Sequence, residues 1–136
     1  MAKLTIRYEP DPNDETGRLW FDIEGARFSG TAFFWSNLSE IPEIVVALRQ
    51  YPMNEPIFWT WGYNSSEGDD LVLYFGVAPN GRTGSLYVEV KIADLYDLSN
   101  RLTTKFETDY ASIERLSTEL DAMGAQRAGE AILSGT

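Results

Sequence analysis

Short segments in which apolar and polar residues alternate recur along most of the chain. Leu4, Ile6 and Tyr8, for example, are separated by Lys3, Thr5 and Arg7. A period of two is typical of a β-strand with one buried face and one solvated face. Other segments with a strand pattern span residues 18–24, 26–35, 57–63, 71–77, 86–92 and 102–108. Turn-forming stretches such as EPDPNDETG and APNGRTG separate several of them, which favours antiparallel pairing of consecutive strands.

Two further segments have the apolar spacing of a helix. One comprises Ile41, Ile44, Val45 and Leu48, and the other Ile113, Leu116, Leu120 and Met123, with Gly124 where a helix would end. A helix with one apolar face has to cover part of a sheet. We therefore expect an α+β fold with a single antiparallel, strongly twisted sheet of about six to seven strands and two helices, one after the third strand and one C-terminal.

The length of 136 residues is that of one domain with one core. We expect residues 1–124 to form this single α+β domain. Residues 125–136 have no clear continuation of either pattern, so the sequence predicts a weakly ordered C-terminal tail there.

The composition excludes several kinds of chemistry. The chain has no histidine and no cysteine, which removes Ser-His-Asp and Cys-His catalysis and thiolate or histidine metal sites. With 21 acidic and 11 basic residues the formal charge is −10, so nucleic-acid binding is disfavoured. No apolar run is long enough to cross a membrane, and MAKLTIRYEP is not a secretory signal, so we expect a cytoplasmic protein without a membrane partner.

Carboxylates two residues apart lie on one face of a strand, as do Asp22 with Glu24 and Glu107 with Asp109. A carboxylate-dependent hydrolase could use such a pair. Charged residues on a solvated strand face are the commoner explanation, and we expect no enzyme activity. In KFETDYASIERL, where a strand pattern gives way to a helix pattern, Asp109 or Thr108 is expected to cap the final helix.

The tryptophans have two interpretations. Trp59 and Trp61 share one strand face with Ile57 and Tyr63, and burial of this row is favoured over stacking on sugars or anchoring a partner. Trp20 alternates with Asp22 and Glu24 on the face opposite the apolar residues of its strand. We therefore expect Trp20 to be an exposed anchor in acidic surroundings.

The order of several motifs resembles small bacterial immunity proteins of the WapI-like type. These motifs are FSGTA at 28–32, a helix, a Trp-containing strand, residues 70–77, a turn with Gly84, LYVEV at 86–90, and FETD at 106–109 before a helix. The resemblance extends over residues 18–123. It implies a cytoplasmic binding protein that neutralises a toxin by occluding it, with no catalytic residues of its own.

The first functional hypothesis is therefore an acidic, aromatic-bearing face that binds a basic protein toxin domain, such as a nuclease. No cofactor or metal is expected. The residues expected to bind the partner are Trp20, Asp22, Glu24, Asp69, Asp70 and Glu107. The alternative is a carbohydrate- or small-ligand-binding module that uses exposed tryptophans, and a concave aromatic face would distinguish it.

Overall fold

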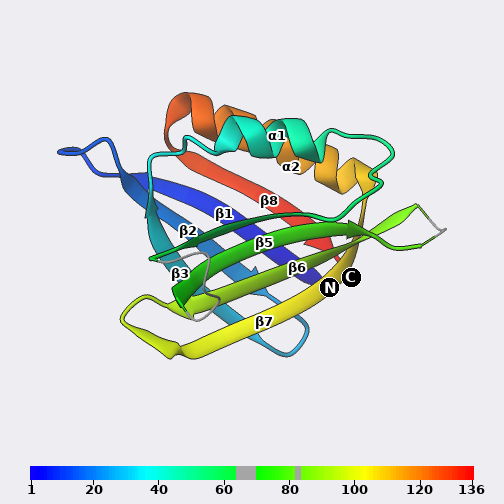
Figure 1. Cartoon of the computed structure of the whole chain (residues 1–136), viewed down its shortest axis with the longest axis horizontal. Helices are drawn as coiled ribbons and strands as arrows, with labels where there is room; N and C mark the ends of the chain where they lie inside the picture. Colours follow the sequence, from blue (N-terminus) through cyan, green and yellow to red (C-terminus); the bar gives the residue numbers. More distant parts are fainter. Residues whose placement is uncertain (64–69, 82–83) are drawn as a thin grey trace.

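The computed structural model describes residues 1–63, 70–81 and 84–136. Figure 1 shows strands below a pair of helices, with both ends of the chain close together. The elements are β1 (Ala2–Pro10), β2 (Gly17–Glu24), β3 (Ser29–Ser36), α1 (Ile41–Leu48), β4 (Ile57–Gly62), β5 (Leu71–Pro79), β6 (Ser85–Asp94), β7 (Asp97–Asp109), α2 (Tyr110–Gln126) and β8 (Gly129–Gly135).

The strands of the described chain form two antiparallel sheets of four strands each. Sheet A has the order β3-β2-β1-β8, and sheet B has the order β4-β5-β6-β7. The α+β class with antiparallel strands and two helices is confirmed, but the prediction of a single sheet of six to seven strands is wrong. The chain leaves sheet A after β3, forms α1, and starts a new sheet at β4. Each sheet then buries its apolar face against the other sheet and the helices.

The last residues of the chain form a strand of sheet A. β8 pairs with β1 from Ala2 opposite Gly135 to Tyr8 opposite Gly129. Ala131 and Leu133 of β8 are fully buried. The stretch 125–136 is therefore not the weakly ordered tail that the sequence suggested, because α2 continues to residue 126 and a left-handed residue, Arg127, turns the chain back towards β1.

Contrary to the sequence prediction, Gly124 does not end the C-terminal helix. It lies inside α2, where a Cβ atom would come within 2.9 Å of Cγ2 of Ile41 in α1. The missing side chain therefore allows the two helices to pack closely.

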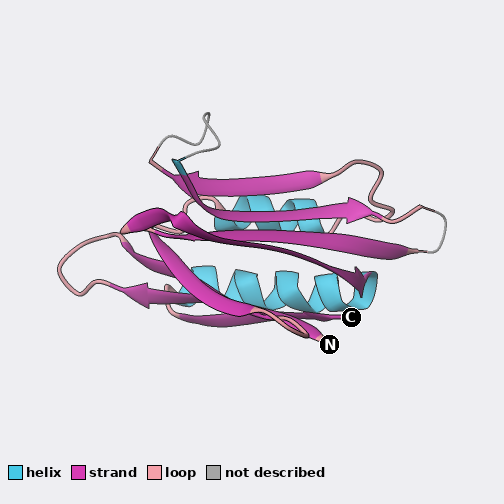
Figure 2. Cartoon of the chain, turned by 90° about the horizontal axis from the view of Figure 1, so that it is seen from below, coloured by secondary structure: helices cyan, strands magenta, loops and turns pink. Residues whose placement is uncertain are grey.

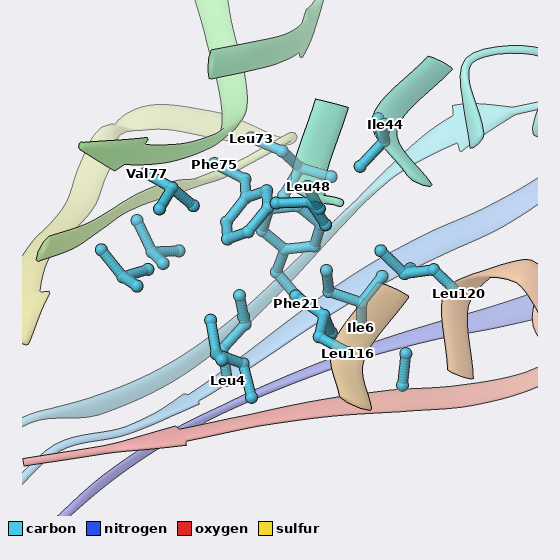
Figure 3. Close-up of a cluster of buried hydrophobic side chains, with 14 of the residues drawn as sticks. Leu4, Ile6, Phe21, Ile44, Leu48, Leu73, Phe75, Val77, Leu116 and Leu120 are labelled. Atoms are coloured by element: carbon cyan, nitrogen blue, oxygen red, sulfur yellow. The ribbon is translucent and has the colours of Figure 1, made fainter. Parts of the chain in front are cut away.

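The two sheets and two helices share one hydrophobic core. Figure 3 shows Leu4, Ile6 and Phe21 of sheet A facing Leu73, Phe75 and Val77 of sheet B, with Ile44, Leu48, Leu116 and Leu120 of the helices completing the cluster. In the view of Figure 2 the helices lie between strands of the two sheets. The face of each sheet that points away from this core is called its outer face below.

The tryptophan row of β4 faces the core, as the favoured interpretation predicted. Trp61 is buried and meets Phe21 of sheet A edge to face, with ring centroids 5.4 Å apart. Trp59 is half-buried and stacks on Phe75. Tyr63, just beyond the strand, is 66% exposed. Trp61 therefore contributes to the contact between the two sheets, and Trp59 packs against the core from within sheet B.

The acidic junction at residues 106–109 joins β7 to α2. Asp109 is the N-cap of α2, and its Oδ1 accepts a hydrogen bond of 2.7 Å from the backbone N–H of Ser112. Phe106 is buried and Glu107 is exposed. The predicted cap at Asp109 is confirmed, and the junction is the start of a helix.

We expect Asp109→Ala to lower the free energy of unfolding by about 1 kcal/mol at pH 7, because the cap is lost. Hydrogen bonding from Ser112 holds the pKa of Asp109 below its ordinary value of 3.8. A lowered pKa in the folded state stabilises the fold above the unfolded value, and this contribution is lost as the pH falls through the folded value. Urea unfolding at a series of pH values should show the wild type and Asp109→Ala converging below about pH 4.

Asp109→Asn is the matched control for this cap. Asparagine keeps an acceptor for the Ser112 N–H, so Asp109→Asn should retain most of the free energy of unfolding at pH 7. Because an amide does not titrate, the loss of stability that the Asp109 carboxyl causes at acidic pH should be absent. Equal unfolding midpoints for the wild type and Asp109→Ala at pH 7 would show that the cap contributes nothing.

Candidate functional site

A groove of 590 Å³ lies on the outer face of sheet B. Small-molecule sites commonly have volumes of about 300–1,000 Å³. We call it the Gly76 groove and define it by the lining residues Tyr74, Gly76, Ala78, Tyr87, Glu89 and Lys105. These residues come from β5, β6 and β7, so the register of three neighbouring strands positions them.

Gly76 forms the floor of the groove. It lies opposite Phe58 of β4 on one side and Glu89 of β6 on the other. A Cβ atom on Gly76 would be 3.0 Å from Cε1 and Oη of Tyr74, so the Tyr74 ring leans over the backbone of β5 at this residue. A glycine inside a strand often marks such a close approach. The absence of a side chain at Gly76 therefore lets the Tyr74 ring pack over the backbone of β5 and places its phenol in the groove lining.

Tyr74 is held by contacts on the outer face. Its ring stacks on Phe58 with centroids 5.6 Å apart and an angle of 14° between the ring planes. The Lys91 ammonium lies 4.8 Å from the Tyr74 ring centroid. Burial, and to a lesser degree the negative charge of Glu89, raises the pKa of Tyr74. The phenol therefore keeps its proton at neutral pH and can donate a hydrogen bond at the edge of the groove.

Charged groups of both signs meet at Glu89. Its carboxylate is 3.6 Å from Nζ of Lys105 and 4.0 Å from Nζ of Lys91. Both distances exceed that of a hydrogen bond, so these are ion pairs of modest strength at a partly exposed site. The Glu89 oxygens and the Lys105 ammonium can therefore exchange this pairing for hydrogen bonds to a ligand.

Tyr87 provides an aromatic face on the other side of the floor. Its side chain is 43% exposed and lies opposite Glu107 of β7 in the strand register. Within the described residues, no aromatic ring or cation stacks on Tyr87. The ring is thus free to contact a ligand, unlike the ring of Tyr74.

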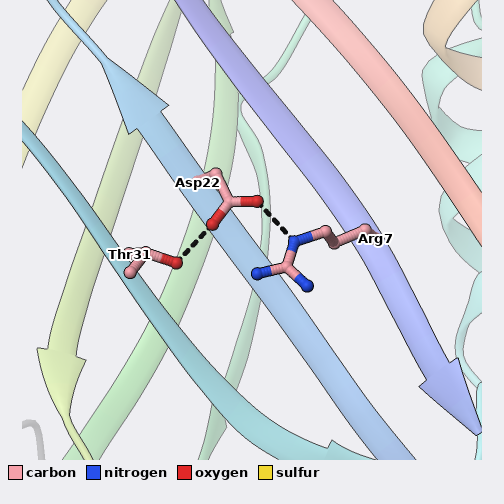
Figure 4. Close-up of polar contacts among 3 residues, drawn as sticks. All are labelled: Arg7, Asp22 and Thr31. Atoms are coloured by element: carbon pink, nitrogen blue, oxygen red, sulfur yellow. Dashed lines mark hydrogen bonds and ion pairs between the residues drawn. The ribbon is translucent and has the colours of Figure 1, made fainter.

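The carboxylates that were expected on an acidic face of sheet A have partners within the chain. Figure 4 shows Asp22 between Arg7, whose Nε donates to Oδ2 at 2.6 Å, and Thr31, whose hydroxyl donates to Oδ1. Glu24 is 3.6 Å from the ammonium of Lys3. Both acidic residues are therefore at least partly neutralised by the neighbouring strand β1.

Trp20 is half-buried, in contrast to the exposed anchor that was predicted. The Arg7 guanidinium carbon lies 4.4 Å from the centroid of the Trp20 ring, which also packs against Phe33 at 4.7 Å. Its indole Nε1 is buried and has no hydrogen-bond partner in the part of the chain that the structure describes. Arg7 thus covers the surface that a partner would have to contact.

Of the remaining predicted residues, Asp70 and Glu107 lie outside sheet A. Asp69 is outside the described residues, and Asp70 is half-buried just before β5. Glu107 is exposed on the outer face of sheet B, where Asn80 Nδ2 donates to it at 3.2 Å. The five predicted residues that the structure describes are not brought together, and among them only Glu107 lies opposite a residue of the Gly76 groove.

Three other features each place requirements on the described residues: a metal site, a two-carboxylate hydrolase site and a membrane-spanning helix. In residues 1–63, 70–81 and 84–136 there is no cluster of three or more acidic side chains that could hold a metal ion. The groove lining contains one carboxylate, Glu89, where a hydrolase of the kind considered above would need two. None of the helices described is long and apolar enough to span a membrane.

The architecture places the chain in a class of α+β proteins with two four-stranded antiparallel sheets and a pair of helices around one core. One solved structure similar to it is that of WHY1 from Arabidopsis thaliana, with a TM-score of 0.53 and 13% sequence identity over 93% of this chain and 77% of that chain. At this identity the similarity concerns the fold alone. No family model and no curated protein matches the sequence.

Proposed function

We propose that this chain is a non-catalytic binding protein that takes a small organic ligand in the Gly76 groove. The observation that carries the proposal is that the groove over β5, β6 and β7 brings together the exposed ring of Tyr87 and hydrogen-bonding groups from Tyr74, Glu89 and Lys105. Pockets that combine apolar surface with a few convergent polar groups are the usual form of a ligand site. The small-ligand alternative was expected to use a concave face of tryptophans; what supports the present proposal is a groove lined by the tyrosines Tyr74 and Tyr87. The absence of cysteine fits action in the reducing cytoplasm.

A fragment library followed by ¹H–¹⁵N NMR tests this proposal. We expect the compounds that bind to shift the backbone amides of Gly76, Ala78 and Tyr87, and Tyr87→Ala to weaken binding at least tenfold. Tyr96→Ala is the matched control, because Tyr96 is 81% exposed and lies in the turn between β6 and β7, outside the groove lining. If no compound shifts the groove amides, or if both variants bind equally well, the groove is not a ligand site.

A second candidate function is neutralisation of a basic toxin domain, as the resemblance to WapI-like immunity proteins implies. Two observations favour it: the formal charge of −10, and the exposed Glu107 opposite the free Tyr87 ring on the outer face of sheet B. Surfaces that bind nucleic acid are positive, so a protein with a net charge of −10 is attracted to a nuclease site even where the contacting face itself carries charges of both signs. Under this hypothesis the outer face of sheet B contacts the toxin.

Co-purification at low salt from the native cells, with mass spectrometry of the eluate, would identify such a partner. Its association rate should fall on the order of tenfold or more as ionic strength rises from low to high salt. Glu107→Gln should slow association more than the matched change Glu24→Gln, because Glu24 is already paired with Lys3. An association rate that does not change with salt would argue against an electrostatically guided basic partner.

A further inference from the structure

We infer that the ligand of the Gly76 groove is a neutral sugar, with one ring lying against Tyr87 and its hydroxyl groups directed to Tyr74, Glu89 and Lys105. This inference rests on the proposed function of the groove. It assigns a chemical class to the ligand, and the assignment follows from charge, hydrogen-bonding capacity and spacing.

The charges around the groove balance. Lys91 and Lys105 contribute two positive charges, and Glu89 and Glu107 contribute two negative charges on the same outer face. An anionic ligand would meet both carboxylates and the overall charge of −10, and a cationic ligand would meet both ammonium groups. Neither kind of ion gains from the local field, so the site favours an uncharged ligand.

The polar groups match the hydroxyl groups of a sugar. A hydroxyl both donates and accepts hydrogen bonds, so it can bind the Glu89 carboxylate, which only accepts, and the Lys105 ammonium, which only donates. The protonated Tyr74 phenol can do either. A ligand with neighbouring hydroxyl groups can therefore satisfy all three side chains, whereas an apolar ligand would leave Glu89 and Lys105 without hydrogen bonds.

The aromatic face and the spacing agree with this class. Tyr74 lies opposite Lys91 and Tyr87 lies opposite Ala78, so the two tyrosines are four residues apart along the strand direction. Four residues of a strand span about 13 Å, so one sugar ring can lie between Tyr87 and the Tyr74 ring that covers Gly76. The C–H groups on one face of such a ring can pack on Tyr87, whose own ring is otherwise free.

The test is a titration with named sugars, followed by ¹H–¹⁵N NMR. The neutral probes are glucose, galactose, mannose and N-acetylglucosamine, and the charged probes are glucuronate and glucosamine. We expect at least one neutral sugar to shift the amides of Gly76, Ala78 and Tyr87 with a dissociation constant on the order of millimolar, as befits a shallow site for one ring. Glucuronate and glucosamine should bind at least tenfold more weakly than their neutral counterparts.

Variants show whether the sugar uses the groove. Tyr87→Ala and Glu89→Gln should each weaken sugar binding at least tenfold, while the exposed controls Tyr96→Ala and Glu24→Gln should leave it unchanged. Unfolding midpoints close to that of the wild type establish that each variant is folded. Sugar binding that survives both groove substitutions would overturn the assignment.

The outcomes separate this inference from the proposed function on which it rests. If library fragments shift the groove amides but none of the neutral sugars does, the sugar assignment is wrong and the groove remains a ligand site. Stronger binding of glucuronate or glucosamine than of the neutral sugars would also overturn the assignment. If neither fragments nor sugars shift these amides, both the inference and the proposed function fail.

Discussion

Removal of residues 129–136 is expected to leave a chain that does not fold cooperatively. β1 would lose its pairing with β8 from Ala2 to Tyr8, and α2 would lose the strand that lies beside it. The core would also lose Ala131 and Leu133, which are both fully buried. The total stability of a domain is about 5–15 kcal/mol, so these losses together are enough to unfold it. Far-UV circular dichroism during urea unfolding measures the effect directly.

A point substitution in β8 separates the effect of packing from that of length. Leu133→Ala should lower the free energy of unfolding by about 2–5 kcal/mol, because it removes a fully buried side chain and leaves a cavity. Ser134→Ala is the control in the same strand. Ser134 is exposed, and it accepts a hydrogen bond from the Thr108 hydroxyl through its backbone carbonyl, which the substitution keeps. Loss of the Ser134 hydroxyl should therefore change the free energy of unfolding by less than about 0.5 kcal/mol. A shortened chain that unfolds at the wild-type midpoint would mean that β8 is dispensable.

Phe21→Ala is the single substitution with the largest expected effect, a loss of about 3–5 kcal/mol. The Phe21 side chain is 1% exposed and meets Trp61 of sheet B edge to face. It borders a small internal gap together with Ile6 of β1, Ile41 of α1 and Leu120 of α2. The ring thus lies where both sheets and both helices meet, and few neighbours can move to fill the space that it would leave.

Thermal unfolding should show the Phe21→Ala change as a fall in Tm of about 10 °C or more, since 1 kcal/mol corresponds to a few degrees in a domain of this size. Phe28→Ala is the matched control, because Phe28 is 71% exposed and precedes β3. Its Tm should stay within about 2 °C of the wild type. Similar falls for the two variants would show that Phe21 is not the centre of the core.

The strands and helices could be predicted from the sequence because each has a periodic pattern of its own. The division into two sheets could not, because alternation shows which residues of a strand are buried but not which strand lies next to it. β3 and β4 are joined through α1, and nothing in either pattern shows that they belong to different sheets. β8 was missed because its apolar residues Ala131, Ile132 and Leu133 are consecutive and do not alternate with polar ones, and because the strand begins and ends with glycine.

The candidate groove illustrates the same limit. A glycine inside a strand, such as Gly76, often marks a close backbone approach, and the alternation within residues 86–92 puts Tyr87 and Glu89 on one face of their strand. Their meeting with Tyr74 and Lys105 depends on the register of β5, β6 and β7, which one sequence does not reveal. The register also explains why Asp22 and Glu24 of sheet A were expected to bind a partner although both are paired within the chain. The cations that pair with them are on β1, where the register places Lys3 opposite Glu24 and Arg7 opposite Trp20, two residues from Asp22.

The pairing of β1 with β8 has a consequence for the synthesis of the protein. At about 5–20 residues per second, the ribosome needs on the order of ten seconds to make the chain between the first strand and its partner at residues 129–135. During that time one edge of β1 has no partner, and side chains such as Leu4 and Ile6 lack the β8 part of their core. Folding of this protein is therefore completed only when the end of β8 has left the ribosome, and until then the nascent chain depends on its surroundings to keep that edge from pairing with another molecule.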